Sequence, residues 1–219
     1  MKSSGISLKQ QIMQDMVEGY WVPGDRLTLN ELAGRYDASH TPIREALREL
    51  YGEGFLEMGA GKTFQLRTLN RDFIENIFDI RSNLEVMLVR KAASKCRAAD
   101  LFKLEEINQQ LAGEVEKKDF AAAILINREF HDHINTIAEN PEAVRILKMH
   151  WIFIASLWKT LGYGQERLSN VIQDHAAIIQ AIRFNDSEAA ATLMGAHVTK
   201  AKYALLARLK DRYLKGGNN

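Results

Sequence analysis

Cysteine is almost absent from this chain, and its scarcity excludes a disulfide-rich secreted protein. The single residue, Cys96, cannot form an internal disulfide and suits a reducing compartment such as the cytosol. No apolar run reaches the length of a membrane span, and the first ten residues carry no secretory pattern. We therefore expect a cytoplasmic protein with no membrane segment.

The chain also lacks an excess of charge of either sign. Its formal net charge is +1 over 219 residues. The segment that ends at Leu69 carries eight basic and nine acidic residues. A protein that coats DNA without sequence preference is strongly basic, because it neutralises phosphates. Any DNA binding by this chain must therefore concentrate the positive charge on one face.

Residues 28–53 are the most informative stretch, because they predict two short helices joined by a tight turn. Thr28 and Glu31 fit a capping box that starts the first helix. Ser39 is a candidate N-cap for the second helix, and Pro42 lies in its first turn. Apolar residues at helical spacing should face inward from the second helix: Ile43, Ala46, Leu47 and Leu50. The opposite face carries His40, Thr41, Arg44 and Arg48.

A predicted hairpin follows these helices. Residues 55–58 and 63–67 have strand character, and residues 59–62 form a glycine-containing turn with Lys62 at its tip. A hairpin after a helix-turn-helix makes a winged helix, which places its second helix in a major groove. The alternative for the two helices alone is a plain helical hairpin within a core. We predict DNA contacts from Ser39, His40, Thr41, Arg44, Arg48 and Lys62.

The segment VPGDRLTLNELAGRYDASHTPIREALRELYGEGFLEM resembles the DNA-binding domain of GntR-family transcription factors, and it is closest to the FadR-like branch. The shared positions include Pro23-Gly24, the stretch from Thr41 to Leu47, and Glu53-Gly54. The resemblance implies a DNA-binding regulator. The family usually has arginine where this chain has His40, and arginine reads guanine through two parallel hydrogen bonds. Histidine cannot make that pair, so a different base preference is expected at this position.

The remainder of the chain predicts helices only. The expected fold is mainly α, with a winged helix-turn-helix over residues 1–69 and an all-α bundle over residues 72–213. Asn140 before Pro141 marks a helix start, and Gly162 marks a helix end. The six predicted helices cover residues 72–96, 98–117, 119–139, 141–161, 165–184 and 187–213.

Three of these helices each place one histidine in an apolar stripe. The histidines are His131, His175 and His197, and Asn127 lies one turn before the first of them. His133 should face elsewhere, toward solvent. One such histidine alone would indicate a hydrogen-bonded core residue. Three together also fit a shared divalent metal ion such as Zn or Ni, with Asn127 as a fourth ligand and positions left open for water or a small molecule.

This region resembles the FCD domain, the helical ligand-binding domain of the FadR-like branch. The matching segments are Asn127 to His131, Asp174-His175 and His197. In the family, an aspartate and three histidines hold a metal ion, and Asn127 stands in place of that aspartate. Asparagine can bind a metal through its oxygen but brings no charge. Six helices in this domain resemble the VanR-type subgroup.

Arg81 lies in another apolar stripe and has two interpretations. It could pair with Glu85, one turn further on, or its guanidinium could bind a ligand carboxylate, as the family resemblance implies.

We therefore predict a ligand-responsive transcriptional regulator, and not an enzyme. The family resemblance implies a repressor that its ligand releases from DNA. As a homodimer it would bind a palindromic operator, and it would hold a divalent metal and a small carboxylate effector. The alternatives are a metal sensor and an all-α metalloenzyme.

Overall fold

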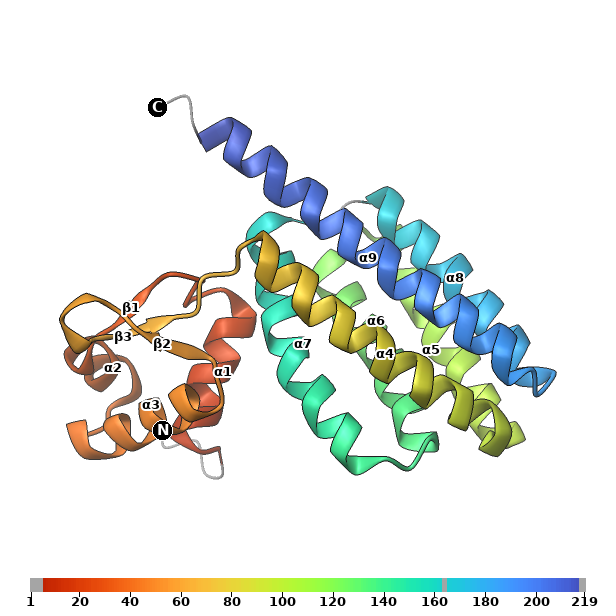
Figure 1. Cartoon of the computed structure of the whole chain (residues 1–219), viewed down its shortest axis with the longest axis horizontal. Helices are drawn as coiled ribbons and strands as arrows, with labels where there is room; N and C mark the ends of the chain where they lie inside the picture. Colours follow the sequence, from red (N-terminus) through yellow and green to blue (C-terminus); the bar gives the residue numbers. More distant parts are fainter. Residues whose placement is uncertain (1–5, 163–164, 217–219) are drawn as a thin grey trace. The chain divides into compact units, whose positions relative to one another are not determined.

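The computed structural model describes residues 6–162 and 165–216, without the side chains of residues 62, 165, 166 and 212–216. The chain divides into two compact units, Met1–Asn70 and Arg71–Asn219 (Figure 1). The first unit combines short helices with a small sheet. In the second unit, the described residues form helices only. The expected fold class, a winged helix-turn-helix followed by a helical bundle, is confirmed.

The first unit contains three α-helices and three short strands within its described residues. Its helices are α1 (Leu8–Glu18), α2 (Leu29–Tyr36) and α3 (His40–Gly52). Its strands are β1 (Arg26–Leu27), β2 (Leu56–Met58) and β3 (Phe64–Leu66), with a 3-10 turn, η1 (Ala60–Lys62), between the last two.

Local hydrogen bonds explain where the helix-turn-helix begins and turns. The Thr28 hydroxyl accepts the Glu31 backbone N–H, which starts α2. The same hydroxyl donates to the Glu31 carboxylate, so the expected capping box is only half formed. Asp37 ends α2 in a left-handed conformation, with φ 47°. Ser39 occupies the N-cap position of α3, as expected, but its side chain makes no capping hydrogen bond.

The wing is a three-stranded antiparallel sheet in the order β1-β3-β2. Strands β2 and β3 are the expected hairpin, with Glu57 opposite Gln65. Strand β1 was not expected, since two residues are too few to show an alternating pattern. The core of this unit includes Leu27, Leu32, Ile43, Leu47, Leu50 and Phe55.

The described part of the second unit consists of six helices. They are α4 (Arg71–Lys95), α5 (Ala98–Glu116), α6 (Phe120–Ile137), α7 (Pro141–Leu161), α8 (Gln165–Arg183) and α9 (Ser187–Gly216). Asn140 starts α7 by accepting the Ala143 backbone N–H, and Pro141 takes the first helical position. Gly162 ends α7 with φ 81°, a conformation that favours glycine.

The packing of these helices brings together the apolar faces of α6, α8 and α9, each of which carries one histidine. Helix α4 lies beside α9 along most of its length, while α5 packs against α6 and α8 (Figure 1). Helices α8 and α9 are also neighbours, so α4, α6, α8 and α9 enclose a common interior. Among the residues that the structure describes, no helix is long and apolar enough to cross a membrane.

Candidate metal centre and DNA-binding face

The three histidines of the apolar stripes meet in the interior of the helical unit. His131 comes from α6, His175 from α8 and His197 from α9, and all three are buried. Each offers a ring nitrogen, and these nitrogens lie within 4.8 Å of one another. Periodicity along three separate helices therefore identified side chains that the fold brings to one place.

Two carboxylates, one buried and one partly buried, lie beside two of these imidazoles. Glu85 on α4 has one oxygen 2.6 Å from Nδ1 of His131, which is ion-pair distance, although the two atoms are not aligned as a hydrogen bond. Asp174 on α8 has one oxygen 3.2 Å from Nδ1 of His197. A carboxylate at Nδ1 favours a proton on that nitrogen, so the lone pair is then on Nε2.

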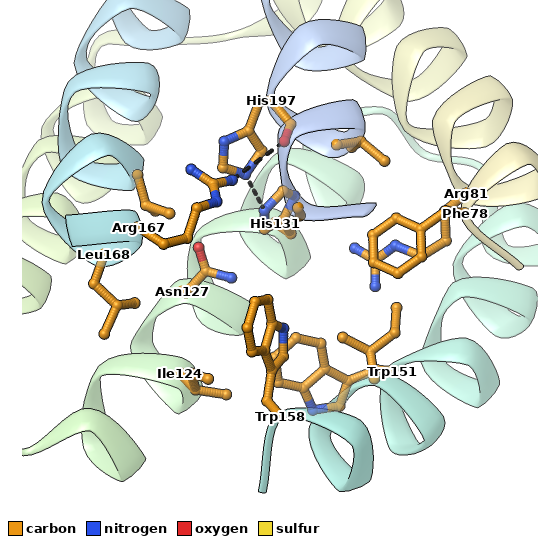
Figure 2. Close-up of a pocket in the computed structure, with 14 residues that line it drawn as sticks. Phe78, Arg81, Ile124, Asn127, His131, Trp151, Trp158, Arg167, Leu168 and His197 are labelled. Carbon is orange, nitrogen blue, oxygen red and sulfur yellow. Dashed lines mark hydrogen bonds between the residues drawn. The ribbon is translucent and has the colours of Figure 1, made fainter. Parts of the chain in front are cut away.

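The two Nε2 atoms of His131 and His197 face each other at 3.2 Å (Figure 2). With both protons on Nδ1, neither Nε2 can donate to the other, and two lone pairs point into the same space. Two nitrogens held at about 2.0–2.1 Å from one tetrahedral zinc ion lie about 3.3 Å apart. The observed separation therefore fits two ligands of one ion.

His175 completes the set and has its hydrogen-bonding capacity unused. Its ring stacks on Phe130, with centroids 3.7 Å apart and planes 8° from parallel. Neither of its ring nitrogens has a hydrogen-bond partner among the described residues. The Oδ1 atom of Asn127 is also buried and has none within that part of the chain. Unsatisfied buried polar atoms are costly, and a shared cation would satisfy these acceptors together.

Burial also sets the protonation state that a metal requires. It lowers the pKa of His197 to about 4, although the nearby Asp174 acts in the opposite direction. Burial likewise holds the pKa of His175 well below its ordinary value, and the neighbouring His197 and His131 add to this effect. Both rings are therefore neutral at pH 7, as metal ligands must be. His133, the matched residue on α6, lies outside the cluster, 3.8 Å from Asp100 and partly buried instead of facing solvent freely.

The structure places Arg81 beside Glu85, while the contact of Arg81 with a ligand carboxylate stays a prediction. Its guanidinium forms an ion pair with Glu85, and both side chains are buried. Arg81 also lines the cavity beside the histidines (Figure 2). Burial alone would raise the pKa of Glu85, but the charges of Arg81 and His131 outweigh it and lower that pKa. Glu85 thus links the arginine to a histidine, a role that the sequence reasoning missed.

The cavity has a volume of about 60 Å³, enough for a few water molecules or a short organic ion. Asn127, His131, His197, Trp151 and Trp158 lie along it (Figure 2). It contains a second arginine that sequence reasoning also missed, Arg167 on α8. Its spacing of seven residues from Asp174 was an available signal, since that interval returns to the same helix face.

In the first unit, the face of α3 that was predicted to bind DNA is open to solvent. Ser39, His40, Thr41, Arg44 and Arg48 are all exposed, while the opposite face is buried. The side chain of Lys62, the sixth predicted contact, lies outside the described residues.

Part of the acidic charge of this unit is neutralised by an ion-pair cluster outside the predicted DNA-binding face of α3. Lys9 of α1 pairs with both Glu49 and Glu53, at 3.3 Å and 2.8 Å. His40, Arg44 and Arg48 line a groove of about 620 Å³ that continues along Thr63 and Phe64 of the wing. A basic groove between a helix and a wing is compatible with a DNA backbone and its base edges.

Comparison with known proteins finds a family match for each of the two units. Residues 7–65 match the bacterial regulatory proteins of the gntR family, and residues 76–200 match the FCD domain. The Nta operon transcriptional regulator of Aminobacter aminovorans is 29% identical over 84% of this chain and 86% of its own length. The regulator McbR of Escherichia coli is 26% identical over 85% and 87% of the two chains.

The solved structure of E. coli McbR/YncC has a similar fold. It superposes with a TM-score of 0.78 at 24% identity, and the match covers 95% of this chain and all of that one. These relatives are regulators, so the interpretation as an all-helical metalloenzyme is set aside. The chain belongs to the GntR family of DNA-binding transcriptional regulators, in the FadR-like branch whose members carry a C-terminal FCD domain.

Proposed function

We propose that this regulator binds a palindromic operator as a homodimer in the cytoplasm and releases or engages it in response to a small carboxylate. In this proposal Asn127, His131, His175 and His197 hold one divalent ion, with Zn or Ni as the candidates, and Arg81 holds the acid. Ser39, His40, Thr41, Arg44, Arg48 and Lys62 contact the operator.

One observation carries the metal proposal: the opposed Nε2 atoms of His131 and His197 at 3.2 Å, each with a carboxylate behind its ring. A hydrogen-bonded core would need one of the two rings to donate through Nε2. With neutral rings, that arrangement would leave Glu85 or Asp174 facing a ring nitrogen without a proton, in a buried site. A divalent cation removes both conflicts, and it would supply a Lewis acid beside the cavity.

The DNA proposal is supported by the exposed polar face of α3 and by the groove that it shares with the wing. Arg44 and Arg48 lie one turn apart on that face. We assign Arg44 to a base edge and Arg48 to a phosphate, because the N-terminal half of a recognition helix usually lies deeper in the groove. Two copies related by a two-fold axis would read the two halves of a palindrome.

A second candidate is a metal sensor, in which the ion itself is the effector. The ring nitrogens of His175 favour it. They are buried and have no hydrogen-bond partner among the described residues, so an ion that bound there would change the interactions of this side chain most. Operator binding measured during a metal titration, and then with small acids at saturating metal, separates the two. A sensor responds in the first titration, and an acid-responsive regulator responds in the second.

The metal site is tested by a matched pair of variants on α6. We expect one divalent ion per chain in the purified, untagged wild type and in His133→Ala. We expect loss of the ion in His131→Ala, because His133 lies outside the cluster and His131 within it. Elemental analysis measures the stoichiometry. A wild-type protein that contains no ion and takes up none would mean that the histidines form a polar core instead.

A further inference from the structure

Two arginines from different helices line the cavity, and they approach it from opposite sides. Arg81 belongs to α4 and Arg167 to α8, and in Figure 2 the two lie on either side of the histidine pair. Each pairs with a carboxylate that also contacts a histidine. Arg81 pairs with Glu85, and Nη1 of Arg167 lies 3.4 Å from Asp174. The cavity therefore has one arginine on each of two walls.

Both arginines retain donors that the protein does not use. The Nε atoms of Arg81 and Arg167 are buried and, within the described part of the chain, have no acceptor. The indole Nε1 of Trp151, on the same cavity, is in the same state there. A guanidinium offers five N–H donors, and a carboxylate can accept up to about four hydrogen bonds. Acid groups at both walls would satisfy donors that are otherwise buried at a cost.

The charge balance indicates how many acid groups the cavity needs. Behind the cavity wall, Glu85 and Asp174 each offset the charge of one arginine; Asp174 also pairs with Lys200, but the charge of that exposed side chain is screened by solvent. The proposed metal ligands are three neutral imidazoles and the neutral amide of Asn127, so they offset none of the charge of a divalent ion. A monoanion would leave one positive charge uncompensated in a largely buried site. A dianion would compensate both.

We infer that the effector is a short-chain dicarboxylate, with one acid group held by Arg81 and the other by Arg167. This inference rests on the proposed metal and effector function, and it narrows the ligand from small acids in general to those with two acid groups. The cavity of about 60 Å³ limits the length of the chain between them. Arg167 is then the residue that determines specificity for the second acid group.

Calorimetric titration of the metal-loaded protein tests this with ligand pairs of equal chain length. The pairs are malonate and propionate, succinate and butyrate, and glutarate and valerate. We expect one diacid to bind about 10- to 100-fold more tightly than its monoacid, the gain that charge-assisted hydrogen bonds to a second group supply. Inorganic phosphate, a compact dianion that cannot reach both walls, should bind more weakly than that diacid.

Three variants test the residues involved. Arg167→Gln should bring the ratio of diacid to monoacid affinity close to one. Arg183→Gln, a matched change at the other end of α8 whose partner is Glu105, should leave that ratio as in the wild type. Asn127→Asp adds one negative charge beside the ion. That charge would compensate one positive charge of the ion, so the ratio of diacid to monoacid affinity should fall as well, although both arginines are unchanged.

The outcomes separate this inference from the function on which it rests. Failure of every acid to bind the metal-loaded protein would overturn the proposed acid response itself. Monoacids that bind as tightly as diacids would overturn only the dicarboxylate. A preference for diacids that survives in Arg167→Gln would overturn the assignment of the second acid group, and so would phosphate that binds as tightly as the best diacid.

Discussion

Asp174→Asn is the most direct test of the carboxylates behind the histidines. Asp174 accepts from Lys200 Nζ at 2.6 Å and lies 3.2 Å from Nδ1 of His197. Burial alone would raise the pKa of Asp174, but these contacts outweigh it and hold the pKa well below its usual range. Asparagine keeps the shape of the side chain and removes the charge that fixes the proton of His197 on Nδ1. We expect metal affinity to fall by about 10- to 100-fold, the usual effect of losing such a partner.

The effect can be measured as the stabilisation that the metal adds. At a free metal concentration 100 times the wild-type Kd, binding adds about 2.7 kcal/mol to the free energy of unfolding. A tenfold weaker site at the same concentration adds about 1.4 kcal/mol. Urea unfolding with metal and with a chelator gives this increment for each protein. The metal-free stability cancels in the difference, so any loss of the contacts to Lys200 and Arg167 does not affect the comparison.

Asp132→Asn is the control, because Asp132 follows His131 on α6 but pairs outward with Arg128 at 3.2 Å. Its metal increment should equal that of the wild type. If Asp174→Asn folds and retains the full increment, then Asp174 serves only its ion pairs with Lys200 and Arg167. The proton assignment that makes the two Nε2 atoms into ligands would then be wrong.

Two further predictions concern the DNA-binding unit. Arg44→Ala should cost about 1–3 kcal/mol of operator binding and relax base preference at one position per half-site, whereas Arg48→Ala should weaken all sequences alike and flatten the salt dependence. Competition binding with operator variants at several salt concentrations checks both, and unchanged selectivity in Arg44→Ala would contradict the placement of α3. Asp15→Asn should destabilise this unit by about 1–2 kcal/mol, because Arg35 at 2.5 Å and Tyr36 lose a charged acceptor. The Arg35 contact lowers the pKa of Asp15 from its ordinary value of 3.8, so the advantage of the wild type is complete above that value and is lost as the pH falls below it. Urea unfolding between about pH 5 and pH 3 measures this difference, and an advantage that stays constant over that range would rule out the charge as its source.

Features with a local cause could be predicted from the sequence. The start of α7 depends on Asn140 and Pro141, and its end depends on Gly162, so neighbouring residues are enough to locate both. The inward direction of His131 follows from its place in a helical stripe that includes Ile124 two turns before it and Ile134 one turn after it. The same logic applies along α8 and α9. Convergence of the three histidines then required only that the three apolar faces share one core.

Features that depend on which helices are neighbours could not be predicted in this way. Glu85 was recognised only as a possible partner of Arg81 on its own helix. Its contact with His131 requires α4 and α6 to pack side by side, and no pattern within one helix encodes that. Arg167 was missed for a related reason. Only the folded bundle places its guanidinium beside the carbonyl of His197, at 3.3 Å, and on the cavity wall.

The arrangement around the cavity also explains how an acid and a metal ion could influence each other. Arg81, Glu85 and His131 form one connected set, and Arg167, Asp174 and His197 form another. In the proposed function, an acid that engages either arginine would change the charge felt by a carboxylate beside a proposed metal ligand. Under the proposed function, the two binding equilibria would be coupled through the protein, and thermodynamic linkage would make the coupling reciprocal: the ion would change acid binding by the same factor as the acid changes ion binding. In this regulator, metal would then set the acid concentration at which the operator responds.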